Sequence, residues 1–131
     1  MIGVDTNILL RALMDDDPVQ SPAARAYLNH LAPARPGYVN LIVLAELTWT
    51  LRSRFKANLA DVLLAVEALL DNAVLVIEAR ESVAEAVEIA RSGRSSFSDA
   101  MIGLVNRHAG CMETMTFDRG APSEAGFTVL T

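Results

Sequence analysis

Four acidic residues stand out because each borders or interrupts an apolar segment: Asp5, Glu46, Asp99 and Asp118. Carboxylates that are crowded or withdrawn from water are costly unless they are paired or bound to a cation. Mg²⁺ and Mn²⁺ prefer hard oxygen ligands, and a few carboxylates with room for water make such a site. The pattern therefore predicts a divalent-metal site that can activate water and stabilise the charge of a phosphodiester.

The elements that must position these acids follow from the apolar pattern. Strands are predicted at residues 2–5, 38–39, 74–77, 112–116 and 127–130, and helices at residues 7–14, 18–31, 41–55, 59–70, 82–91 and 97–109. Asn58 and Asp61 are spaced as a capping pair, as are Ser96 and Asp99. Strands that alternate with helices predict an α/β fold: a three-layer α/β/α sandwich around a mostly parallel five-stranded sheet.

This topology is expected to bring three acids to one edge of the sheet. Asp5 ends the first strand, Asp118 closely follows the fourth, and Asp99 lies in the first turn of the last helix. Strand ends and helix starts share an edge of a parallel sheet, and functional groups gather there. Glu46 interrupts the apolar run 41–47, so it lies either on the exposed stripe of a buried helix or in a functional cleft.

Each acid also has a purely structural interpretation. Asp5 would favour the N-terminus of the following helix, and Asp99 would complete a capping box with Ser96. Glu46 would be a solvated helix residue, and Asp118 an ordinary turn aspartate. The remaining acids are interpreted as solvated loop, helix-face or helix-end residues, among them Asp15, Asp16, Asp17 and Glu78.

Composition limits the classes of function. The 131 residues fit one domain, 1–131, and the net charge of −5 argues against broad electrostatic binding to nucleic acid. Contacts to nucleic acid would then come from local arginines or from a partner. The hydrophobic fraction of 52% favours a well-filled core together with an apolar surface that a partner covers.

Cellular location is predicted from what the sequence lacks. The single cysteine, Cys111, rules out a disulfide within the chain and a cysteine-based zinc site, and is expected to be a buried small hydrophobe. The N-terminus lacks the basic and apolar stretches of a signal peptide, and no apolar run approaches the roughly 20 residues that cross a bilayer. We therefore expect a cytoplasmic protein without membrane association.

Four short motifs resemble, in order, those of PIN domains. They are VDTNIL at residues 4–9, VLAEL at 43–47, FSDAMI at 97–102 and TFD at 116–118. The resemblance covers essentially the whole chain, and the size is similar to that of VapC-type toxins of bacterial toxin–antitoxin pairs. It implies an endoribonuclease that uses Mg²⁺ or Mn²⁺ and leaves 5′-phosphate and 3′-hydroxyl ends. It also implies a homodimer and a small antitoxin protein as partner. The apolar surface that a partner covers would then be supplied by Leu9, Leu13, Leu28, Leu63 and Leu70.

The resemblance also assigns roles to residues. The catalytic acids would be Asp5, Glu46, Asp99 and Asp118, with Asp5, Asp99 and Asp118 as metal ligands. Support of the site would come from Thr6, Asn7, Ser96 and Thr116. Ser96 stands where family members often carry a further acid, which implies weaker binding of a second metal. Arg94 and Arg119 are candidate contacts to RNA phosphates, although basic residues near helix ends also complement the helix dipole.

Two other functions stay open. A non-catalytic PIN-like module would bind RNA or protein without cutting; loss of one of the four acids would favour it, and none is lost. A phospho-aspartate signalling or phosphatase domain also places an aspartate after a short strand. The phosphatase would need a second aspartate where Asn7 stands. Both need a late lysine, whereas the only lysine is Lys56.

Overall fold

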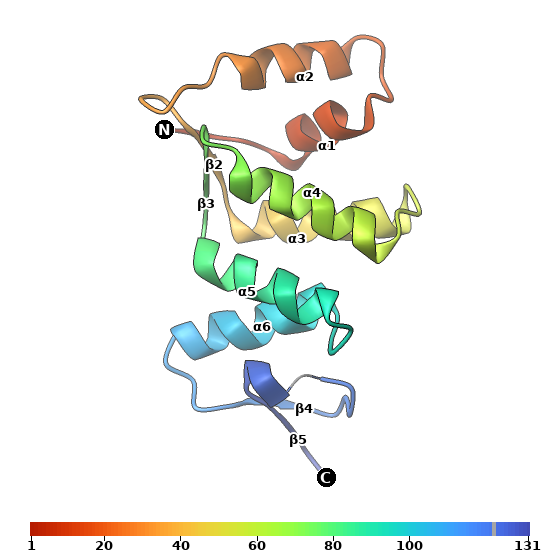
Figure 1. The fold of residues 1–131 in the computed structure, drawn as a ribbon, viewed down its shortest axis with the longest axis vertical. Helices are drawn as coiled ribbons and strands as arrows, with labels where there is room; N and C mark the ends of the chain where they lie inside the picture. Colours follow the sequence, from red (N-terminus) through yellow and green to blue (C-terminus); the bar gives the residue numbers. More distant parts are fainter. Residues whose placement is uncertain (122) are drawn as a thin grey trace. The chain divides into compact units, whose positions relative to one another are not determined.

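The computed structural model describes residues 1–121 and 123–131 of the chain. These residues form two compact units, an N-terminal unit (Met1–Glu78) and a C-terminal unit (Ala79–Thr131). Figure 1 shows that short strands and helices alternate along the chain.

The N-terminal unit is a three-stranded parallel sheet with four helices. In chain order it contains β1 (Ile2–Gly3), α1 (Thr6–Met14), α2 (Gln20–Asn29), β2 (Gly37–Val39), α3 (Leu41–Ser53), α4 (Leu59–Asp71) and β3 (Leu75–Ile77). The sheet order is β1-β2-β3, so β2 is central. Helix α1 packs on α2 and α3, and α3 packs on α4, which contacts β3 (Figure 1).

The centre of this sheet needs a glycine. A Cβ atom at Gly37 would lie 2.9 Å from side-chain atoms of both Leu31 and Val4 and 3.0 Å from Leu75. Those apolar side chains close over β2 and join the core beneath α3, where Leu44 and Leu47 are fully buried. The close packing holds the C-terminal ends of β1 and β2 directly before α1 and α3.

The C-terminal unit packs two helices and a small parallel ribbon. It contains α5 (Arg80–Arg91), α6 (Phe97–His108), β4 (Thr114–Thr116), the 3₁₀ helix η1 (Ser123–Ala125) and β5 (Phe127–Val129), with β4 parallel to β5. Helix α5 buries a stripe at Val83, Ala86, Val87 and Ala90, the spacing of one helical face, and packs on α6. Helix α6 also contacts η1.

The predicted elements are confirmed in type and order. Six helices and five strands occur at the predicted places, with bounds within two residues of the prediction, and every strand pair is parallel. The single five-stranded sheet is not confirmed, because the described strands form one sheet of three strands and one of two.

Several predictions about burial were wrong. Leu9, Leu63 and Leu70, expected on a partner-covered surface, lie in the core with exposed fractions of 2%, 3% and 7%. Cys111 is exposed, because it follows Gly110 in the turn that ends α6.

The large apolar side chains that are exposed include Leu13, Val19, Ile42, Trp49, Met112 and Phe117. Within the described part of the chain, no helix is long and apolar enough to cross a membrane.

Candidate active site

Asp5 stands between β1 and α1 with an exposed side chain. It occupies the N-cap position of α1 in an extended conformation, yet its carboxylate accepts no capping hydrogen bond from the helix. Instead, the backbone carbonyl of Asp5 accepts a hydrogen bond from the N–H of Ile8 at 3.1 Å. The sheet fixes the segment, because the Val4 N–H donates to the Tyr38 carbonyl at 2.9 Å. The backbone of Asp5 is therefore fixed, and its exposed carboxylate is left available to a ligand.

Glu46 is anchored to Thr6, the residue that follows Asp5. The hydroxyl of Thr6 donates a short hydrogen bond to Glu46 Oε1, and Thr6 itself is 5% exposed. Because Thr6 directly follows Asp5 in the chain, the Cα atoms of Thr6 and Asp5 are about 3.8 Å apart. Glu46 lies on an exposed stripe of α3 with Ile42 and Trp49, four residues before it and three after it. The helix thus presents one carboxylate oxygen to Thr6 and leaves the other in solvent.

The start of α3 is fixed by two side chains. The Asn40 side chain accepts from the N–H of Val43 at 2.8 Å, and Glu78 Oε1 accepts from the N–H of Leu41 at 2.9 Å. Glu78 follows β3, and its own N–H donates to the Val39 carbonyl at 2.9 Å. Interpreting Glu78 as solvated was therefore wrong. Its position directly after a strand, like that of Asp5, was the signal that could have found it.

In the C-terminal unit, Asp99 lies half-buried in the first turn of α6. Its backbone N–H donates to Ser96 Oγ at 3.1 Å, so the predicted N-cap of α6 is confirmed. That bond uses the Asp99 backbone and leaves its carboxylate out of the cap. Ser96 therefore positions Asp99 and leaves the carboxylate oxygens of Asp99 available to a ligand.

Asp118 lies exposed in a turn after β4. Its Oδ1 accepts from the Gly120 N–H at 2.8 Å, and its own N–H donates to Thr116 Oγ1 at 3.0 Å. These are the bonds of an ordinary aspartate turn, as the structural interpretation expected. One carboxylate oxygen is engaged, which leaves Oδ2 as its ligand atom.

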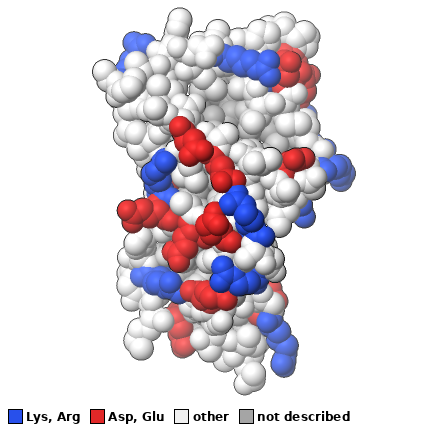
Figure 2. Space-filling view, viewed as in Figure 1, with Lys and Arg blue, Asp and Glu red and all other residues white. Residues whose placement is uncertain are grey.

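The two candidate arginines differ in their surroundings. Arg94 donates to Ser92 Oγ at 2.5 Å and forms an ion pair of 3.5 Å with Glu124. Arg119 is exposed and makes no ion pair within the described residues. Figure 2 shows basic side chains interspersed with acidic ones on the visible face, without a continuous basic surface. Arg119 is therefore the better candidate for a phosphate contact.

The four candidate acids are divided between the two units. The structure places Asp5 and Glu46 in the N-terminal unit and Asp99 and Asp118 in the C-terminal unit. Among the residues described, no three His, Cys, Asp or Glu side chains form a group that could hold a metal ion. Mg²⁺ often binds through only one or two carboxylates and keeps several waters. The exposed Asp5 carboxylate, a hard oxygen ligand without a capping bond, fits that requirement.

Comparison with known proteins identifies the family. No curated protein sequence matches the chain significantly. The PIN domain family model matches residues 2–125, which include every helix and strand except β5 and all four acids. The chain therefore belongs to the PIN domain family.

Proposed function

We propose that this chain is a metal-dependent endoribonuclease that hydrolyses RNA phosphodiester bonds with Mg²⁺ or Mn²⁺. PIN domains are generally nucleases and typically use divalent metal ions. The observation that best supports the proposal is the pair of carboxylates in the N-terminal unit. The Asp5 side chain occupies an N-cap position without a capping bond, and the next residue, Thr6, binds Glu46. Because the Asp5 carboxylate makes no capping bond at the helix start, it is available to bind a ligand.

We assign the catalytic role to Asp5, Glu46, Asp99 and Asp118. The metal ligands would be Asp5, Asp99 and Asp118. A bound ion would supply charge stabilisation at the phosphodiester and lower the pKa of a water molecule. Thr6 occupies Glu46 Oε1, so Oε2 is the atom that would accept a proton from the attacking water. Support would come from Thr6, Asn7, Ser96 and Thr116.

The finer assignments rest on the family resemblance. We propose that the protein is the toxin of a type II toxin–antitoxin system, acts in the cytoplasm, and forms a homodimer that binds a small antitoxin. Arg119, and Arg94 if it leaves Glu124, would contact RNA phosphates. We also propose that residues 1–131 form one domain, a three-layer sandwich with a five-stranded sheet, since the family match runs through both units.

The test is cleavage of total cellular RNA with Mg²⁺, with Mn²⁺ and with chelator. Asp5→Asn and Asp99→Asn are expected to abolish cutting. Asp61→Asn is the matched control, because Asp61 also lies in the first turn of a helix with its N–H bonded to an N-cap side chain. Products should carry 5′-phosphate and 3′-hydroxyl ends. Cutting that survives chelator, or products with 2′,3′-cyclic phosphate, would refute the mechanism. No cutting by the folded wild type would favour the non-catalytic binding module.

A further inference from the structure

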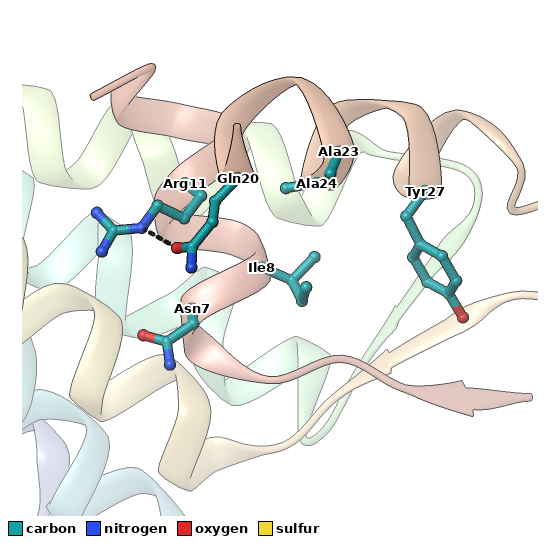
Figure 3. A pocket seen from close by; sticks show the side chains of 7 residues that line it. All are labelled: Asn7, Ile8, Arg11, Gln20, Ala23, Ala24 and Tyr27. Carbon is teal, nitrogen blue, oxygen red and sulfur yellow. Dashed lines mark hydrogen bonds between the residues drawn. The ribbon is translucent and has the colours of Figure 1, made fainter. Parts of the chain in front are cut away.

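A groove runs between α1 and α2 within the N-terminal unit. It encloses about 380 Å³, and its apolar wall is formed by Ile8, Ala23 and Ala24 (Figure 3). Asn7 and Gln20 lie on one side of Ile8, and the Tyr27 ring lies on the other. The volume lies within the range of about 300–1,000 Å³ that is usual for small-molecule sites. The groove therefore has a polar end and an aromatic end.

The walls of the groove are braced by the acidic segment that joins the two helices. Arg11 donates to Gln20 Oε1 at 2.9 Å and to Asp16 at 2.7 Å. The backbone N–H groups of Gln20 and then Val19 donate to Asp17, which lowers the pKa of that carboxyl and fixes the start of α2. Asp15, Asp16 and Asp17 form a solvated loop, as predicted, and the carboxylates of Asp16 and Asp17 also bind groups of α1 and α2. These bonds join the last turn of α1 to the start of α2 on one side of the groove.

The chemistry of the lining selects a neutral ligand. The only cation in the lining, Arg11, is already paired with Asp16, so the groove offers no uncommitted charge to a phosphate. What remains for a ligand is the amide of Asn7, the NH₂ group of Gln20 and the ring and hydroxyl of Tyr27. Amides bind hydroxyl groups, and an aromatic ring beside an apolar wall stacks with a nucleobase. These groups together match a nucleoside.

We propose that this groove binds one nucleoside of the RNA substrate, with its base against Tyr27 and Ile8 and its ribose hydroxyls at Asn7 and Gln20. The inference deepens the proposed function and rests on it. Asn7 is two residues after Asp5, in the first turn of the helix that Asp5 begins. The bound nucleoside is therefore a close neighbour of the bond to be cut. Contact with the 2′-hydroxyl distinguishes RNA from DNA.

Binding is tested separately from cleavage. The Asp5→Asn protein is titrated with adenosine, uridine and 2′-deoxyadenosine in the absence of metal, and amide NMR signals are followed. Ribonucleosides are expected to shift signals of α1 and α2 and to bind at least several-fold more tightly than 2′-deoxyadenosine. Tyr27→Leu is expected to weaken binding about tenfold or more, since it removes a stacking platform. Tyr27→Phe keeps the ring and should retain most of the affinity.

Two further variants complete the design. Gln20→Leu should remove the preference for ribose, whereas Asn29→Ala, an exposed amide at the end of α2 that does not line the groove, should change nothing. In RNA cleavage, Tyr27→Leu should raise KM more than it lowers kcat. Nucleoside titrations that leave the groove signals unmoved would overturn the inference. So would groove signals that shift only with protein concentration, as for a second copy of the chain. If nucleosides bind but RNA is never cut, the groove stands as a nucleoside site and the nuclease proposal fails.

Discussion

The hydrogen bond from Thr6 to Glu46 allows the proposed active site to be perturbed without removing an acid. Thr6→Val keeps the shape of a side chain that is 5% exposed and deletes only its hydroxyl. Glu46 then loses the bond that holds Oε1 and can rotate in solvent. Thr6→Ser, which keeps the hydroxyl, is the rescue variant.

The magnitude follows from the burial of the two partners. A hydrogen bond to a charged group contributes about 1.5–3 kcal/mol, but water can replace the hydroxyl at the exposed Glu46. We therefore expect a loss of about 1 kcal/mol in the free energy of unfolding, measured in urea. Removing a partner that orients a metal-site group typically costs about 10–100-fold. We expect a fall of that size in kcat for RNA cleavage, with KM little changed.

Thr48→Val is the matched control. Thr48 is also 5% exposed, and its hydroxyl donates to the Ala45 carbonyl at 3.0 Å within the same helix, α3. It should alter stability by a similar small amount and leave kcat unchanged. The reasoning is refuted if Thr6→Val cleaves RNA as fast as the wild type. It is equally refuted if Thr48→Val lowers kcat as much as Thr6→Val does.

Three further predictions concern stability. Gly103→Ala would press a Cβ against the backbone oxygen of Ala125 and should cost about 3 kcal/mol in urea unfolding; Gly3→Ala, with no atom within 4 Å, should be nearly neutral. Glu78→Ala removes a capping bond from α3 and should cost about 1 kcal/mol by the same measurement. Asp17 stabilises the fold above its ordinary pKa of 3.8, and this contribution disappears as pH falls through its lowered pKa; Asp17→Asn should therefore flatten the acid limb of the stability profile.

Local structure was predictable because its signals are local. The helix predicted at residues 82–91 and the caps at Asn58 and Ser96 each depend on residues no more than a few positions apart, and all were found where the sequence indicated. The family motifs could also be recognised in the sequence, because each is a short run of consecutive residues.

Long-range pairing was not predictable from the same signals. The bonds from Thr6 to Glu46 and from Leu41 to Glu78 join residues 40 and 37 positions apart, and no periodicity encodes which partner each will meet. Burial of Leu9 and exposure of Trp49 likewise depend on which helix face meets a neighbour. A pattern of apolar residues indicates that a face exists but does not identify what covers it.

The cap that Glu78 provides has a consequence for how the protein is made. A chain that emerges from the ribosome N-terminus first presents all of α3, with Glu46 in its middle, before β3 and Glu78 exist. The first N–H group of α3 gains its native partner only after β3 has aligned with β2, a parallel pairing that must close a long loop. The helix that carries a proposed catalytic acid is thus completed late in translation. A nascent chain of fewer than 78 residues therefore carries α3 without the Glu78 cap while it is still beside its own messenger RNA.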